Sequence, residues 1–467
     1  MKENFWNQQE VYVTTVCILG IIAVISGYFT FLPLLLLLVI GSIFCFKNKK
    51  RIFLITLICI ICFLRGENIA TVHRHDANFL LPNNNISIWM DIIQISGDKI
   101  TTIANNKRFL CKNSFTHLNT GDKILTQSTF EYPTSFSDNF NYPLFLQKDN
   151  IVGLCTINKI QQLLTKPHTL SIVDIRNFVL QTMKDMWTND SYGFISGILI
   201  GQKSEVPKDL STIFKTIGLS HVLVLSGFNI TIVALFFVNI LTFLPRKQRL
   251  YGSLIGVWIF IIFVGGEAPL IRAGLMGSLA IYGKIMERES NIWIAFALSV
   301  LILTLINPLT PIVDIGFQLS VTALLGLLLG VSSVEHLFQW SPKKYGIQEI
   351  LTTSLACQLW TLPIMLYYFG NFSLISLLAN LIITPWVPYL MLLGAISTIF
   401  SIVGIGFILT KLTEVFSETL LHTTRLLSEV PFASIHIPIT FTWFHVVIMY
   451  ITLTLYYFYR RKLAEKK

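Results

Sequence analysis

Long apolar runs recur along this chain, and each is close to the ~20 residues that an α-helix needs to cross a bilayer. Of its 467 residues 53% are hydrophobic and only 13% are charged, whereas soluble domains carry roughly 25% charged residues. A soluble core of this composition would lack the polar residues to cover its surface. The sequence therefore predicts a polytopic α-helical membrane protein with about 11–13 spans.

The net charge of +10 lies mostly at the ends of the apolar runs. Basic clusters occupy residues 47–51, 246–249 and 460–467. Lys and Arg gather in cytoplasmic loops and set the orientation of a membrane protein. The positive charge is thus no evidence for a nucleic-acid partner, and it predicts a cytoplasmic C-terminus.

Four segments follow from these patterns. We expect N-terminal membrane helices over 1–66, an extracytoplasmic β domain over 67–165, an amphipathic interfacial helix over 166–190 and the main transmembrane domain over 191–467. Within the last segment the spans are expected near 218–244, 250–265, 268–286, 291–307, 313–334, 349–369, 372–404 (one long or two short), 405–430 and 441–459.

Residues 67–165 differ in kind from the rest of the chain. Short alternating segments at 86–92, 99–103, 108–112 and 122–130 are separated by the turn signals SGD, NN and NTGD. This pattern predicts a small β-barrel or sandwich. Cys111 and Cys155 both fall here, and they could form a disulfide if the domain faces an oxidising exterior, whereas the other cysteines lie in apolar runs.

Polar residues inside the predicted spans are few and grouped. They are His221 with Ser226 and Asn229, Glu267 with Arg272, Asp314 with Gln318, Gln358, and Asn371 with Asn380. A charge at membrane depth costs roughly 2.5–3.5 kcal/mol on insertion scales, and such groups normally face a bundle interior or a watery cavity. For any single residue, hydrogen bonding between helices is the ordinary explanation; the whole set is more typical of a polar path.

Spacing and helix breakers refine this interpretation. Asp314 and Gln318 are four residues apart and would share one helical face. Glycines such as Gly218 and Gly227 permit close helix approach or a break, and prolines inside apolar runs are tolerated where neighbours satisfy the freed carbonyls. We therefore expect broken helices around a polar lumen.

Two enzymatic alternatives find little support. Ser226 and His221 resemble parts of an intramembrane serine protease, but within one helix they would lie about 140° apart and would not meet. The stretch VHRHDAN at 72–78 resembles the start of a zinc-nuclease ligand set, but its Asp is misplaced and its last His is absent. The sequence predicts no catalytic residue, no metal site and no cofactor.

Six motifs in order resemble the ComEC family of DNA-uptake channel proteins. They are SGILIGQKS (196–204), GLSHVLVLSGFNI (218–230), FVGGEAPLIRAGLM (263–276), INPLTPIVDIGFQLSVTALLGL (306–327), QLWTLP (358–363) and ANLIITP (379–385). The stretch NFNYPLFLQKDNIVG (139–153) resembles the end of the family's OB-type barrel. The resemblance covers the chain from about residue 10 to 440.

The resemblance implies an inner-membrane channel that passes one DNA strand to the cytoplasm. Carried over by position, it points to the channel candidates His221, Ser226, Gly227, Arg272, Asp314, Gln318 and Asn380 and to the structural positions Gly218, Gly316, Phe317, Ser320 and Pro385. The polar residues and helix breakers of the spans add Asn229 and Glu267 to the first set and Pro363 to the second. Asn229 stands where the family commonly has a second histidine. Many members continue into a metallo-β-lactamase-like domain; this chain stops at Lys467, so strand degradation would need a separate nuclease.

The implied partners are single-stranded DNA, membrane lipid, an extracytoplasmic DNA receptor, a cytoplasmic helicase-like motor, since no P-loop is seen, and a further copy of the chain in a homo-oligomer. Two other classes of function stay open at this stage. A transporter of another polar solute or polymer could use the same spans, and an assembly scaffold would tolerate apolar replacement of Asn229, Arg272 and Gln318.

Overall fold

The computed structural model describes most of the chain. The described residues are 8–29, 49–77, 86–96, 99–112, 118, 121–135, 140–164, 172–202, 205–223, 225, 227–266, 268–286, 291–342, 346–437 and 441–464. The chain divides into two compact units, of which the first holds residues 1–169, 236–258 and 271–315 and the second holds 170–235, 259–270 and 316–467.

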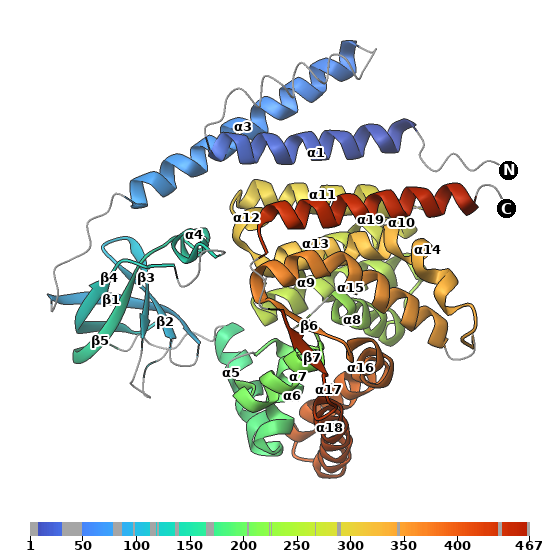
Figure 1. The fold of residues 1–467 in the computed structure, drawn as a ribbon. Coiled ribbons are helices and arrows are strands. Elements are labelled where there is room, and N and C mark those ends of the chain that lie inside the picture. Colours follow the sequence, from blue (N-terminus) through green and yellow to red (C-terminus); the bar gives the residue numbers. More distant parts are fainter. Residues whose placement is uncertain are drawn as a thin grey trace. The chain divides into compact units, whose positions relative to one another are not determined.

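The first unit contains a five-stranded closed β-barrel (Figure 1). Its strands are β1 (Ile86–Ser96), β2 (Lys99–Ala104), β3 (Lys107–Lys112), β4 (Lys123–Glu131) and β5 (Ile151–Leu164), with helix α4 (Tyr142–Lys148) before β5. The strand order is β1-β2-β3-β5-β4, β1 closes on β4, and β3 runs parallel to β5. This order is that of an OB-type Greek-key barrel, which confirms the β-barrel expected before the main membrane domain.

Alternation along the strands explains the barrel. In β2 and β4 every second residue is buried, as a strand with one face on a core requires. Phe109 and Phe130 meet edge to face inside it, with ring centroids 5.1 Å apart. Asn105 and Asn106 adopt positive φ between β2 and β3, the conformation of a tight hairpin turn. Cys111 and Cys155 lie opposite each other in β3 and β5 and are joined by a disulfide.

Three helices of the first unit form a layer of their own. Helices α1 (Gln8–Tyr28), α3 (Lys49–Ala77) and α11 (Ile292–Ile306) share a cluster of buried apolar residues. At the α1–α3 crossing Gly27 lies against the Phe63 carbonyl and Gly66 against the Val24 carbonyl, with no room for a Cβ at either glycine. Small residues of this kind let two membrane helices approach closely.

Helix α3 extends further than the apolar run that predicts it. We expect that run to end at Arg65, but the helix continues to Ala77. Arg65 does not interrupt it because its guanidinium donates to the Leu305 carbonyl near the end of α11, at 3.3 Å. No proline follows before Ala77 to stop the helix.

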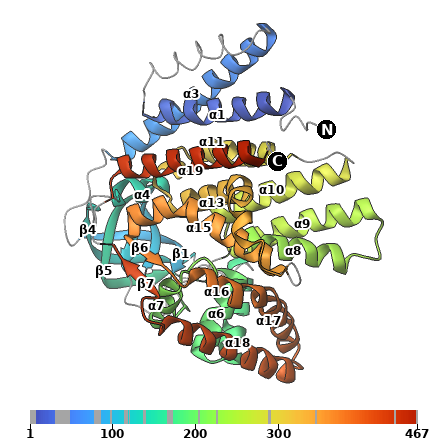
Figure 2. The same ribbon diagram turned by 45° about the vertical axis from the view of Figure 1, so that its right-hand side comes forward.

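The second unit is helical apart from one short sheet, β6 (Asn371–Ser373) with β7 (Ser434–His436) (Figure 2). Its helices are α5 (Ile172–Met186), α6 (Asn189–Ile200), α7 (Lys208–Thr216), α13 (Ile315–Leu325), η2 (Gly326–Gly330), α14 (Val331–Val334), η3 (Glu335–Phe338), α15 (Ile347–Phe369), α16 (Ser376–Ile383), η5 (Thr384–Trp386), α17 (Val387–Ile402), α18 (Phe407–Ser428) and α19 (Trp443–Ala464). Helices α8 (Gly227–Ile240), α9 (Arg246–Val264) and α10 (Ala268–Ile285) contribute to both units, and α12 (Thr310–Val313) belongs to the first.

Four of the described helical stretches are long and apolar enough to cross a bilayer. They are Arg246–Val264, Ile315–Phe338, Ile347–Phe369 and Ser376–Ile402, and shorter apolar helices cover Val13–Tyr28, Gly227–Ile240 and Ile292–Ile306. The prediction of a multi-pass α-helical membrane protein is confirmed. Helix α5 is different, since it exposes Ile172, Ile175 and Phe178 along one side and buries Leu180 and Met183, as an amphipathic helix does.

The disulfide gives a first test. Replacing both Cys111 and Cys155 by Ala should lower the free energy of unfolding of the barrel by about 2–4 kcal/mol, because the bond closes a loop across a sequence separation of 44. Pulse proteolysis of the detergent-solubilised chain would measure the loss. Cys357→Ala removes a free cysteine outside the barrel and serves as the control; equal protease resistance of the double variant and the wild type would contradict the prediction.

Candidate functional site

The segment between α7 and α8 is a break in the helical structure, not the start of a span. Helix α7 ends at Thr216 and α8 begins only at Gly227. Gly218 opens the break with φ +74°, and a Cβ there would lie 2.5 Å from the Ser376 Cβ and 3.0 Å from the Ser373 Cβ. Only glycine fits both this backbone conformation and this space, so Gly218 sets how the break packs against α16.

Asn229 holds the start of α8 against α6. Its side chain is 3% exposed, and its Nδ2 donates to the Ile198 carbonyl at 3.2 Å. Ile198 lies in the last turn of α6, where helix carbonyls have no partner within the helix. Gly201 closes the same end with φ +74°. Asn229 therefore satisfies a helix end and acts as a bond between helices.

Asn380 is satisfied inside its own helix. Its Nδ2 donates to the Ser376 carbonyl at 2.9 Å, and its Oδ1 accepts from the Thr384 hydroxyl at 3.1 Å. Thr384 opens the 3-10 turn η5, in which Pro385 lies and which joins α16 to α17. The amide thus stabilises a bend that the proline makes necessary.

Of four further channel candidates, the structure describes His221 and Gly227. His221 lies within the break and hydrogen-bonds to the backbone of Gly218. Gly227, the first residue of α8, is exposed. Ser226 and Glu267 lie outside the described residues, so their place in the channel and the pairing of Glu267 with Arg272 stay predictions.

Arg272 is a buried cation within a membrane helix, and its counter-charge comes from another element. Only 5% of this α10 residue is exposed, and it interacts electrostatically with Asp314. Asp314 also accepts from the Lys148 ammonium, with Nζ and Oδ2 2.8 Å apart and both side chains about six-sevenths buried, at 15% and 14% exposure. One carboxylate is therefore shared by two cations from different parts of the chain.

Helix α4 carries Lys148 to this carboxylate. Asn307 donates from Nδ2 to the Lys148 carbonyl at 2.7 Å, and Leu144 and Phe145 of α4 pack on a cluster that contains Leu309 and Val313. The Lys148 ammonium lies 4.8 Å from the Phe145 ring centroid, within the range of a cation–π contact. These contacts pack α4, the helix that precedes β5, against the turn after α11.

The expected shared face of Asp314 and Gln318 does not form within one helix. Asp314 has extended backbone at the end of α12, and α13 begins at the next residue. Gln318 instead interacts with the Tyr368 hydroxyl across the second unit. Of its neighbours in α13, Phe317 is buried, Ser320 is half-buried and Gly316 is exposed.

Pro363 lies inside α15 and is buried. A proline removes a backbone donor and disturbs the carbonyls of the preceding turn. The Tyr450 hydroxyl of α19 donates to the Trp360 carbonyl in that turn, at 2.9 Å. Gly326 and Gly330 leave room for the same tryptophan, whose side chain lies 2.9 Å from the Cβ that either would add.

Helix α18 carries a stripe of ionisable residues that the motif analysis missed. Lys411, Glu414, Glu418, His422 and Arg425 follow one another at steps of three and four residues and lie within about 80° of one another around the helix. The hydroxyls of Thr413 and Ser417 lie on a buried face instead. The spacing is visible in the sequence, and a search for periodic charges within apolar segments would find it.

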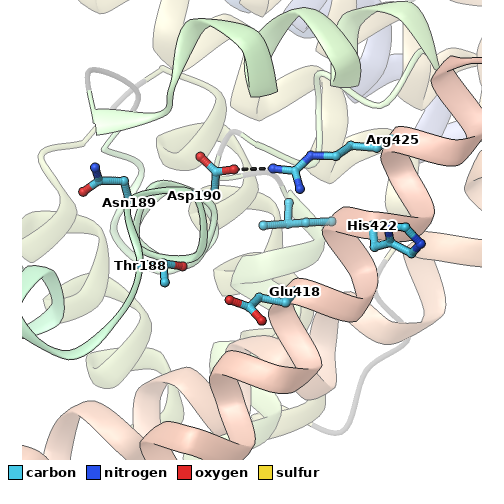
Figure 3. A pocket seen from close by; sticks show the side chains of 7 residues that line it. Thr188, Asn189, Asp190, Glu418, His422 and Arg425 are labelled. Atoms are coloured by element: carbon cyan, nitrogen blue, oxygen red, sulfur yellow. Dashed lines mark hydrogen bonds and ion pairs between the residues drawn. The ribbon is translucent and has the colours of Figure 1, made fainter.

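The stripe ends at a pocket of about 490 Å³ between α18 and the start of α6 (Figure 3). Thr188, Asn189 and Asp190 line it from one side, and Glu418, Leu421, His422 and Arg425 from the other. The Arg425 guanidinium forms an ion pair with Asp190 across the pocket, and Lys411 pairs with Glu414 at 2.8 Å further along α18. Opposite charges thus neutralise each other in two places, as ionisable groups in membrane helices do.

The chemistry available here is that of a polar passage. Carboxylates, an imidazole and hydroxyls hold water and exchange protons. Among the described residues, no group of three or more His, Cys, Asp or Glu side chains could hold a metal ion. The pocket is a poor anion site, because two carboxylates face it and its guanidinium is already paired.

Comparison with known proteins identifies one family. The family model described as "Competence protein" matches residues 198–463. Among curated proteins, ComE operon protein 3 of Bacillus subtilis is 25% identical over 262 residues, Recombination protein 2 of Haemophilus influenzae 26% over 216, and Competence protein ComA of Neisseria gonorrhoeae 23% over 231. These alignments cover 55%, 43% and 46% of this chain and 33%, 27% and 32% of the relatives' lengths. No solved structure matches the chain.

The close packing around Gly218 predicts that a single added methyl group there lowers the stability of the protein. Gly218→Ala should destabilise the second unit by about 2 kcal/mol or more, because it adds both positive-φ strain and overlap with Ser376. The melting temperature of the detergent-solubilised protein would report it. Gly277→Ala is the matched control, since a Cβ there meets nothing within 4 Å; an equal effect of the two substitutions would refute the packing argument.

Because Asp314 interacts with two cations, replacing it should cost more stability than replacing Lys148. Asp314→Asn removes the carboxylate that acts on Arg272 and leaves Lys148 with Asp149 alone, at 4.0 Å, whereas Lys148→Gln leaves Asp314 beside Arg272. Asp314→Asn should therefore cost more stability, and a double-mutant cycle should give a coupling energy of about 1–3 kcal/mol. Lys411→Gln, in a pair whose lysine is 61% exposed, should cost much less. A coupling near zero in thermal unfolding would count against the shared carboxylate.

Proposed function

Because the chain belongs to the competence protein family, we propose that it is a channel that passes one strand of incoming DNA across the cytoplasmic membrane in natural transformation. The observation that carries the proposal is the extent of the family match. It runs over residues 198–463 and so includes the break before α8, the buried Arg272, and α18 with its ionisable stripe. Two of the matched relatives are themselves named as competence proteins or competence-operon products.

The physical requirements of the cargo agree with these features. A strand that crosses a membrane carries one phosphate per nucleotide and needs a hydrated path, and transport of any sequence favours polar linings over groups that read bases. We assign the phosphate contact to Arg272, whose side chain is held at membrane depth by Asp314. His221, Ser226 and Gly227 are further contacts that we propose for the strand, while Asn229 and Asn380 act as bonds that keep the helices in position.

The proposal includes an orientation and partners. The β-barrel lies outside the cytoplasm and the C-terminus inside, as the basic clusters indicate. An extracytoplasmic receptor delivers the DNA, a helicase-like motor in the cytoplasm supplies the energy, and a separate nuclease removes the second strand. Phe109 and Phe130 are buried in the core of the barrel, so they are not positioned to stack on bases, whereas Tyr132 is exposed on its surface.

The decisive experiment follows labelled double-stranded DNA into cells. Deleting the gene should abolish nuclease-protected label, and the wild-type gene should restore it. Arg272→Ala and Gly227→Leu should reach the membrane in normal amounts and fail to restore uptake. The first removes the phosphate contact, and the second fills the path.

Lys208→Ala is the control, since this exposed cation of α7 lies outside the proposed path. Its uptake should equal that of the wild type. Unchanged uptake in the deletion strain would refute the DNA channel and direct attention to another polar solute or polymer. Normal uptake by the Arg272→Ala variant would refute the assigned phosphate contact while leaving the channel itself standing.

A further inference from the structure

The stretch from residue 350 to residue 410 contains no Asp, Glu, Lys, Arg or His. It comprises most of α15, the strand β6, and the whole of α16, η5 and α17, and it ends in the first turn of α18. Turns between membrane helices normally carry polar or charged residues, and cytoplasmic ones carry Lys or Arg. The turn between α17 and α18, residues 400–408, carries no charged residue, and Ser401 is its one polar side chain.

Both ends of this helical hairpin start from one place. β6 precedes α16 and β7 follows α18, and the two strands pair antiparallel, with Asn371 opposite His436 and Ser373 opposite Ser434. The chain therefore leaves the small sheet, reaches the α17–α18 turn and returns to the same sheet. The turn is the far end of the excursion.

That far end is apolar and uncovered. Val403, Ile405, Phe407 and Ile408 are 70%, 67%, 75% and 81% exposed. Contiguous apolar surface of this kind marks a contact with lipid or with another protein. In Figure 1, α19 lies lengthwise across the view while α17 and α18 are strongly foreshortened, so the hairpin does not run alongside α19.

Backbone hydrogen bonds close the end of α17 at this turn. Gly404, at φ +84°, donates to the Ser401 carbonyl at 2.9 Å, and the Ile405 amide donates to the Phe400 carbonyl at 3.0 Å. These two bonds form a Schellman motif, which closes a helix end on itself. The Thr410 hydroxyl and amide both donate to the Gly406 carbonyl at 2.9 Å. The last carbonyls of α17 are thus bonded within the chain, as hydrocarbon surroundings require.

We infer that the α17–α18 hairpin is re-entrant: its turn, residues 400–408, lies embedded among lipid acyl chains and does not emerge on the opposite side of the membrane. The exposed apolar face of α18, with Ile408, Leu412 and Val415, continues the same lipid contact. The ionisable stripe lies beside it, and the Lys411 side chain at its near end is 61% exposed and paired with Glu414. This inference depends on the membrane location of the chain and not on its cargo.

Spin labelling tests the inference directly. A nitroxide would be attached at Val403→Cys in a variant in which Cys17, Cys45, Cys59, Cys62 and Cys357, the cysteines other than the disulfide pair, are replaced by Ala. In phosphatidylcholine–phosphatidylglycerol vesicles, the label should be relaxed by molecular oxygen, which concentrates in lipid, and not by a water-soluble nickel chelate. The matched control is Ser434→Cys in β7, an exposed residue at the sheet end of the hairpin, where nickel should relax the label.

Each other outcome overturns the inference. Access of nickel to the label at Val403 would show that the turn emerges into water. Protection from both oxygen and nickel would show that protein covers it. As an independent check, Ile405→Lys should shift the equilibrium between the embedded turn and the water-exposed turn ~100-fold toward water, and so give nickel access to the label at Val403→Cys. Ile435→Lys in β7 should leave that label inaccessible to nickel. Neither the spin labelling nor the lysine substitutions measure DNA uptake, so their results are independent of those for the proposed channel.

Discussion

A polar group inside a membrane helix has no water to bond with, and most of the specific contacts in this protein meet that constraint. Asn229 satisfies a carbonyl at the end of α6, Tyr450 satisfies one beside Pro363, and Trp187 donates to the Thr410 carbonyl at 3.3 Å. Each contact appears where a helix ends, bends or meets another. The breaks that a passage through the membrane requires are thus possible because side chains replace the missing backbone partners.

The same constraint separates the predicted polar residues into two kinds. Asn229 and Asn380 have their amides occupied by backbone carbonyls, so they hold helices in place and are poorly suited to meet a passing solute. Arg272 is different, because its charge is balanced by a carboxylate that also serves Lys148. This carboxylate offsets part of the cost of burying both cations, so removing it would leave buried positive charge poorly compensated.

Apolar periodicity predicted the membrane helices well, because lipid imposes length and composition directly on the sequence. The span expected near 349–369 is α15, and the one near 441–459 is α19. Alternation likewise predicted the early strands of the barrel. The sequence could not reveal that Lys148 reaches Asp314, since that pairing depends on how α4 packs on the turn after α11. Nor could residue spacing show that α13 starts only after Asp314, because an extended residue at that point leaves no mark on the hydrophobic pattern.

The stripe on α18 shows why a list of rare polar residues is an incomplete guide to a membrane site. Glu418 and His422 are unremarkable one at a time in a helix that also holds Lys411 and Arg425. Glu418 and His422 indicate a site because they share one face of α18 with Lys411 and Arg425, and because Asp190 of α6 pairs with Arg425. Two ion pairs then leave Glu418 and His422 beside an open pocket, the arrangement expected where water enters a helical bundle. The charge pattern along α18 therefore depends on a residue that another helix supplies as well as on the sequence of α18 itself.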